Sequence, residues 1–89
     1  MWYPYSEGND RMPIVFRKGR YRFFFFSNEG HEPMHIHVES DDRHAKFWLE
    51  PVGLANSVGY RAHELNEIRQ LVLAHAALCN RRWHEHFGE

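Results

Sequence analysis

Three histidines lie close together in the stretch HEPMHIHVES, at His31, His35 and His37. Imidazole gains or loses a proton near neutral pH, and it is also the commonest metal ligand in proteins. On a β-strand, His35 and His37 would point to the same face, roughly 6.5–7 Å apart at their Cα atoms. The pair therefore fits acid–base catalysis, metal binding, or histidines that simply form hydrogen bonds on a sheet surface.

A metal ion held by this pair would need a further protein ligand, because catalytic zinc sites have three. The nearby candidates are His31, Glu39 and His44, and none of them stands at a spacing that identifies it as the third ligand. A His-x-His pattern also arises from strand alternation alone. We therefore assign no metal ligand and no cofactor from the sequence, and metal binding stays as one hypothesis among three.

Two alternating segments are expected to position the histidines. Residues 34–39 and 44–50 each place apolar side chains at every second position, which is typical of half-buried strands. A turn at SDDR would join them as an antiparallel pair. This pairing sets three pairs of residues side by side: Glu39 with His44, His37 with Lys46, and His35 with Trp48.

A hairpin is predicted before these strands, over residues 13–26, with Lys18-Gly19 as its two-residue turn. That turn sets Arg17 opposite Arg20, Phe16 opposite Tyr21 and Ile14 opposite Phe23. One face then carries Ile14, Phe16, Tyr21, Phe23 and Phe25 and is expected to join the core. The other face carries Val15, Arg17, Arg20, Arg22, Phe24 and Phe26, so it is basic with aromatic side chains at one end.

The C-terminal third predicts helical structure. Residues 51–60 have the Gly, Asn and Ser content of a connection. Apolar side chains then recur every three or four residues, at Leu65, Ile68, Leu71, Val72, His75, Leu78 and Cys79, and a tail with Trp83 and Phe87 continues the helix or restarts it after Asn80. We expect His75 to be a core histidine hydrogen-bonded to the backbone or to a sheet side chain. The predicted fold class is α+β, a four-stranded antiparallel meander sheet with one face covered by a C-terminal helix, which is continuous, kinked or split in two.

Composition limits the classes of function. The chain has 89 residues and a net charge of −1, so bulk positive charge does not hold it to nucleic acid. Aromatic residues make up 16% of the chain and can supply an efficient core. With one cysteine, no signal-peptide pattern and no long apolar run, we expect a cytoplasmic protein without membrane contact, organised as an N-terminal arm (1–11) and a single domain (12–88).

The second face of the predicted sheet collects basic, imidazole and aromatic side chains. Such a surface can bind single-stranded RNA by phosphate pairing and base stacking. We identify His35, His37 and Lys46 as candidate catalytic residues, because two imidazoles can serve as base and acid while a lysine stabilises negative charge. The candidate substrate- or partner-binding residues are Arg20, Arg22, Phe24 and Trp48. A face of this kind can equally be covered by a partner protein or a second copy of the chain.

The motifs YRFFFFSNEGHEPMHIHVE and AKFWLEP, with the HELNEIRQLV helix, resemble the small bacterial family known as domain of unknown function 4160. The resemblance implies a short α+β protein whose gene neighbours that of another small protein, an arrangement similar to toxin–antitoxin pairs. It places the family's paired histidines on His35 and His37 and its lysine on Lys46. Its tryptophans fall on Trp48 and Trp83, and its helix histidine on His75. Arg61 departs from the pattern, because a helix-capping Ser or Thr is usual there.

The residues and the resemblance together predict a component of a bacterial toxin–antitoxin-like system, with the toxin role favoured. The expected partners are a small antitoxin-like protein encoded by a neighbouring gene and RNA or the translation apparatus. The alternative is a non-enzymatic interaction module that binds a partner or forms a homodimer.

Overall fold

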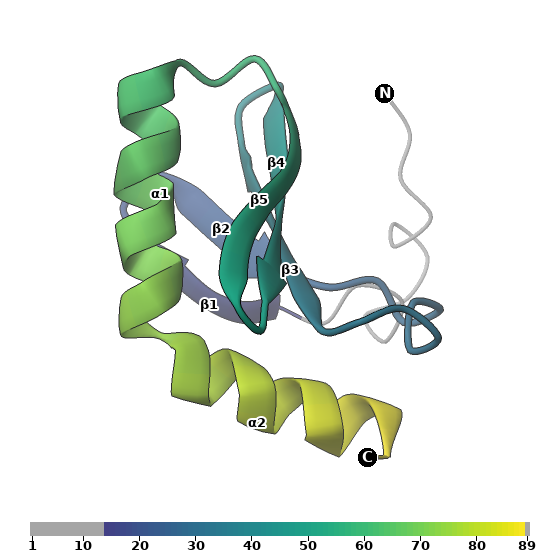
Figure 1. Cartoon of the computed structure of the whole chain (residues 1–89). Coiled ribbons are helices and arrows are strands. Elements are labelled where there is room, and N and C mark those ends of the chain that lie inside the picture. Colours follow the sequence, from purple (N-terminus) through teal and green to yellow (C-terminus); the bar gives the residue numbers. More distant parts are fainter. Residues whose placement is uncertain (1–13, 89) are drawn as a thin grey trace.

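The computed structural model describes residues 14–88, which form an antiparallel sheet followed by two helices (Figure 1). The predicted α+β class is confirmed. The sheet has five strands whose order in space follows the chain: β1 (Ile14–Lys18), β2 (Tyr21–Phe24), β3 (His35–Ser40), β4 (Arg43–Leu49) and β5 (Val52–Val58). The expected arm, residues 1–11, lies outside the described residues.

The β1–β2 hairpin forms, but its predicted register is wrong by one position in the turn. Lys18 pairs with Tyr21 and Phe16 with Phe23, so the turn residues are Gly19 and Arg20. Gly19 has a φ of 58°, which suits the first central residue of the tight turns that join twisted strands. A register shift between Ile14 and Phe16 then turns Val15 into the core, although we expected it on the opposite face.

The β3–β4 pairing is confirmed in register. His35 lies opposite Trp48, His37 opposite Lys46, and Glu39 opposite His44. On the other side of the same strands Ile36, Val38, Ala45, Phe47 and Leu49 are buried in the hydrophobic core. Strict alternation made this register recoverable, because a slip of one residue would have exchanged the two faces.

The prediction of four strands is wrong, because residues 52–58 form β5 rather than a connection. This strand pairs with β4 and is an edge of the sheet. It contains Gly53, Asn56 and Ser57, and Leu54 and Val58 are 46% and 65% exposed. An edge strand that buries little does not need apolar alternation, so the pattern used to find the other strands was absent here.

The helical segment is split in two, at His75 rather than at Asn80. Helix α1 spans Ala62–Ala74 and α2 spans Ala76–Phe87. At the junction His75 Nδ1 donates a hydrogen bond to the Leu71 carbonyl oxygen at 2.8 Å, and its ring stacks on Phe16 at 4.0 Å between centroids. The expected hydrogen bond from His75 to the backbone is therefore confirmed, but its side chain is only partly buried and lies at the margin of the core.

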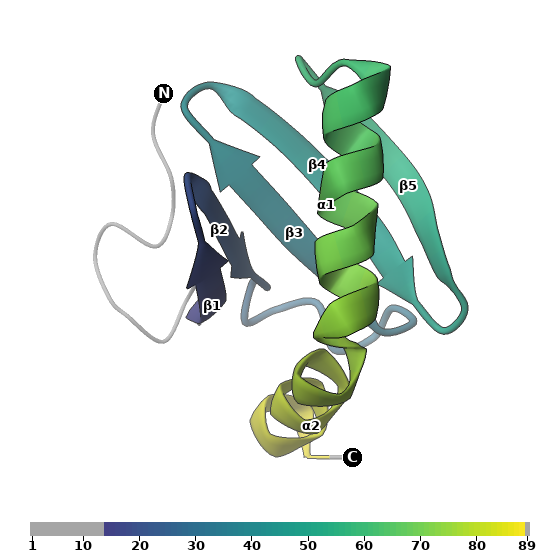
Figure 2. The ribbon, with the colours of Figure 1, turned by 90° about the vertical axis from the view of Figure 1, so that its left-hand side faces the viewer.

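The two faces of the sheet are covered differently. Helix α1 packs across the face over β4 and β5, and α2 contacts β1 and β4 at one end (Figure 2). Between the helices and this face lies the core, which includes Phe23, Phe47, Ile68, Val72 and Trp83. The loop between β2 and β3 lies on the opposite side of the sheet from α1 (Figure 1). No helix within residues 14–88 is long and apolar enough to cross a membrane.

Cys79 offers a test of the α2 packing. Its side chain is fully buried, and burial raises the pKa of the thiol to about 12. Because the thiolate is the reactive form, we expect a disulfide reagent at about pH 8 to modify the native protein at least about 100-fold more slowly than the urea-unfolded protein. Equal rates, followed by absorbance of the released thiol, would contradict this packing.

Candidate functional site

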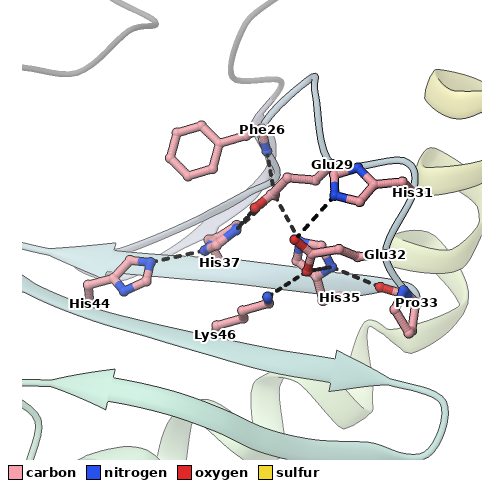
Figure 3. Close-up of polar contacts among 9 residues, drawn as sticks. All are labelled: Phe26, Glu29, His31, Glu32, Pro33, His35, His37, His44 and Lys46. Carbon is pink, nitrogen blue, oxygen red and sulfur yellow. Dashed lines mark hydrogen bonds and ion pairs between the residues drawn. The ribbon is translucent and has the colours of Figure 1, made fainter.

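His35 and His37 lie on the face of the sheet opposite α1, as predicted, but they are buried. Their exposed fractions are 0% and 5%, so the possibility that they form hydrogen bonds on an open sheet surface is excluded. The β2–β3 loop covers them, and its residues Glu29 and Glu32 reach down to the strands (Figure 3). Sequence alternation assigned the side chains to a face but did not show that a loop would cover that face.

Glu29 is the centre of the site. Its Oε1 atom is 2.8 Å from His35 Nε2 and 2.9 Å from His37 Nε2, and its Oε2 atom is 3.1 Å from His37 Nε2 (Figure 3). The backbone N–H of Phe26 also donates to Oε1 at 3.2 Å. The carboxylate is thus within hydrogen-bond distance of two imidazole nitrogens and accepts from one backbone amide, and we call Glu29, His35 and His37 the histidine–carboxylate cluster.

Local loop structure places Glu29 over the strands. The backbone N–H of Glu29 donates to the Phe26 carbonyl, and that of Glu32 donates to the Glu29 carbonyl, which gives two consecutive turns. Gly30 then passes so close to α2 that a Cβ atom there would lie 2.5 Å from Phe87 Cδ1. Glycine at this position therefore allows the loop to sit against α2 with Glu29 directed at the histidines.

His35 has a defined proton at Nδ1. This atom is 2.8 Å from the Pro33 carbonyl oxygen, and because a carbonyl oxygen can only accept, Nδ1 carries the hydrogen. The other nitrogen, Nε2, faces Glu29. The ring is enclosed by Trp48 and Trp83, whose centroids lie 5.9 and 5.0 Å from its own. His35 is therefore fixed in orientation as well as in protonation at Nδ1.

His37 links the cluster to His44. Its Nδ1 atom lies 3.0 Å from His44 Nε2. Burial lowers the pKa of His44, and the nearby His37 lowers it further, so His44 is neutral at about pH 7 and its Nε2 can accept from His37 Nδ1. Phe24 and Phe26 pack on the His37 ring at 5.5 and 4.9 Å.

The protonation of Glu29 is set by its partners. Burial alone would raise the pKa of this carboxyl, but hydrogen bonds from His35 and His37 outweigh burial and hold the pKa far below its usual range. The side chain is only 16% exposed. A carboxylate kept ionised beside two imidazoles in a mostly enclosed site is typical of functional centres.

Lys46 and Trp48 form the rim of the site. Lys46 Nζ donates to Glu32 Oε1 at 2.7 Å and lies 4.7 Å from the Trp48 ring centroid. The lysine lowers the pKa of Glu32 by this hydrogen bond. Among the candidate catalytic residues, the structure therefore brings His35, His37 and Lys46 to one site, with two carboxylates that balance their charge.

The four predicted binding residues do not all lie at the site. Trp48 is half-exposed at the rim. Phe24 is fully buried against His37 and Phe26, so its ring is not open for base stacking. Arg22 forms an ion pair with Glu39 beside the site. Arg20 lies away from the cluster and reaches Glu64 at the start of α1, at 3.4 Å.

The glutamate at position 29 was missed as a site residue. The three sequence candidates for a third ligand are engaged elsewhere or lie further out, with His31 exposed, Glu39 bound to Arg22, and His44 behind His37. A loop residue has no strand parity to locate it. The available signal was distance along the chain, because a carboxylate six residues before His35 in a short loop can fold back onto the strand that follows.

The fold and the site define a small α+β domain with a buried histidine–carboxylate cluster under a short loop. Comparison with protein families gives one result: the family model described as Domain of unknown function (DUF4160) matches residues 21–84. The chain belongs to this family, as the sequence motifs indicated. No curated protein and no solved structure gives a significant match.

Proposed function

We propose that the protein is the toxin-type component of a bacterial toxin–antitoxin-like system and acts on RNA in the cytoplasm at the histidine–carboxylate cluster. The observation that carries this proposal is the chain of contacts from Glu29 through His37 to His44. It places a carboxylate, an imidazole and a second, neutral imidazole in hydrogen-bond contact. Such groups can act as general acids and bases at about pH 7.

RNA cleavage is a reaction that these groups fit. His44, which is half-buried and neutral, would take the proton of a ribose 2′-hydroxyl on Nδ1 as its oxygen bonds to phosphorus, in the tautomer whose Nε2–H donates to His37 Nδ1. The bond from phosphorus to the 5′ oxygen breaks, and that oxygen receives a proton from the Lys46 ammonium group at the rim of the site. Lys46 at the rim would stabilise the negative charge on the phosphate, and the half-exposed Trp48 offers a ring on which a base can stack.

The first test compares growth arrest in a bacterial host. We expect expression of the wild type to arrest growth and the His35→Ala/His37→Ala double variant to lose this effect. His63→Ala/His84→Ala is the matched control, because it also removes two histidines but both are exposed on helices. Circular dichroism must show that all three proteins fold.

Because His35 is fully buried, its replacement can unfold the domain, so Lys46→Ala and His44→Gln serve as additional variants. Purified wild type is expected to cleave RNA about 10²–10⁴-fold faster than these variants. Equal growth arrest by the wild type and all folded cluster variants would show that the cluster is not catalytic.

A second candidate function, a non-enzymatic interaction module, is favoured by β5. This edge strand carries Leu54 and Val58, which are among the exposed large apolar side chains of the described residues. Unpaired strand edges can add a strand from another chain. We expect light scattering to detect a dimer of the wild type that Leu54→Lys/Val58→Lys abolishes; a monomeric wild type would count against self-association.

A further inference from the structure

We infer that Glu29, His35 and His37 bind a single divalent transition-metal ion through the glutamate carboxylate and the two Nε2 atoms. One oxygen and two nitrogens of these side chains lie within 4.8 Å of one another. Two imidazoles and one carboxylate are the ligand set of catalytic zinc sites and of mononuclear non-haem iron sites. This inference goes beyond the proposed function, because it concerns binding and holds whether or not RNA is the substrate.

The hydrogen bond behind His35 prepares it as a ligand. A metal-bound histidine usually donates its other ring N–H to a carbonyl or carboxylate, which fixes the ring and its tautomer. His35 Nδ1 donates to the Pro33 carbonyl at 2.8 Å. In the neutral ring the lone pair is then on Nε2, the atom that faces Glu29.

His37 has an equivalent support. Its Nδ1 atom can donate to His44 Nε2 at 3.0 Å, which leaves the lone pair of His37 Nε2 directed at Glu29. In this tautomer His44 supports His37 as a metal ligand. Both histidines thus present Nε2 to the same carboxylate while Nδ1 is used elsewhere.

The two imidazole nitrogens and the carboxylate already converge on one point. The Nε2 atoms of His35 and His37 lie 2.8 and 2.9 Å from the same atom, Glu29 Oε1. A divalent ion held between these groups would bind both nitrogen lone pairs and neutralise the carboxylate at the same time.

The surroundings favour an ion at this position. Trp48 and Trp83 enclose His35, and Phe24 and Phe26 pack on His37, so apolar rings limit water around the cluster. The nearest lysine, Lys46, donates to Glu32 rather than to Glu29. Three protein ligands leave at least one coordination position for water or substrate, which is the arrangement of a catalytic rather than a structural metal site.

Metal binding can be measured directly on the full chain, purified without a histidine tag and stripped with a chelator. We expect Zn²⁺ to bind with one equivalent per chain in a calorimetric titration, and Co²⁺ to give visible absorption bands at the same stoichiometry. Glu29→Gln and His37→Gln are expected to weaken Zn²⁺ binding at least about 100-fold, because each removes a ligand.

The matched controls are Glu85→Gln and His84→Ala, which change the same residue types at exposed positions on α2; we expect them to bind as the wild type does. Circular dichroism of each stripped variant checks folding. The inference is wrong if the folded wild type takes up no stoichiometric Zn²⁺ or Co²⁺, or if Glu29→Gln and His37→Gln bind as tightly as the wild type. No RNA is present in these titrations, so the metal site and the RNA proposal can fail separately.

Discussion

Replacing Trp83 with alanine is expected to lower the free energy of unfolding by about 3–5 kcal/mol. The indole is 2% exposed, and its ring centroid lies 5.0 Å from that of His35, 5.4 Å from that of Phe25 and 4.3 Å from that of Phe87. Its removal leaves a cavity where α2, the core and the site meet. Small domains have a total stability of only about 5–15 kcal/mol, so urea unfolding followed by circular dichroism will show the loss clearly.

Trp48→Ala is the matched control for this prediction. Trp48 is partly exposed and lies against the Lys46 ammonium group and the His35 ring, so its truncation removes less buried surface than that of the 2% exposed Trp83. We expect a clearly smaller loss of stability than for Trp83→Ala. Losses of equal size would show that Trp83 does not anchor α2 to the site.

The second large effect is a loss of stability at acid pH that depends on Glu29. Hydrogen bonds from His35 and His37 depress the pKa of Glu29 in the folded protein, whereas in the unfolded chain it is about 4.3. The ionised carboxylate therefore stabilises the fold above that pH, and this contribution is lost as the pH falls toward the folded pKa. Between about pH 6 and pH 2, we expect wild type to lose about 1–2 kcal/mol more than Glu29→Gln, after discounting for solvent screening of a partly exposed carboxylate.

The measurement is urea unfolding of the metal-free protein across this pH range. Glu85→Gln is the control, because Glu85 is 60% exposed and its nearest partner, Arg81, is 3.8 Å away. This variant should follow the wild-type curve. A difference between wild type and Glu29→Gln that stays constant as the pH falls would contradict the depressed pKa of Glu29.

A strand could be predicted from the sequence when apolar and polar side chains alternate regularly along it, so that one face is buried. The predicted β3–β4 register was correct because each of the two strands has one apolar face and one polar face. Only a pairing that puts both apolar faces on the same side of the sheet buries them together. The β1–β2 register was wrong because both faces of β2 carry phenylalanines, so a shift at Val15 costs no apolar burial and leaves no mark in the pattern. β5 was missed because an exposed edge strand has little to bury.

The site followed the same rule. His35, His37, Lys46 and Trp48 were placed together correctly, because all four belong to the one pair of strands with a readable register. Glu29 and Glu32 come from a loop, where position depends on turns and on Gly30 passing Phe87 rather than on periodicity. Alternation along a strand therefore could not locate the two carboxylates of the site.

The meander order of the sheet has a consequence for how the site assembles. Because neighbouring strands in space are neighbours in the chain, no long loop has to close before the strands pair, which is the topology of fast folding among sheet proteins. The polar groups of the site, from Glu29 to Lys46, come from one loop and one hairpin. Either edge strand can thus fray, or take up a partner strand, while the central hairpin keeps the polar groups of the site in register.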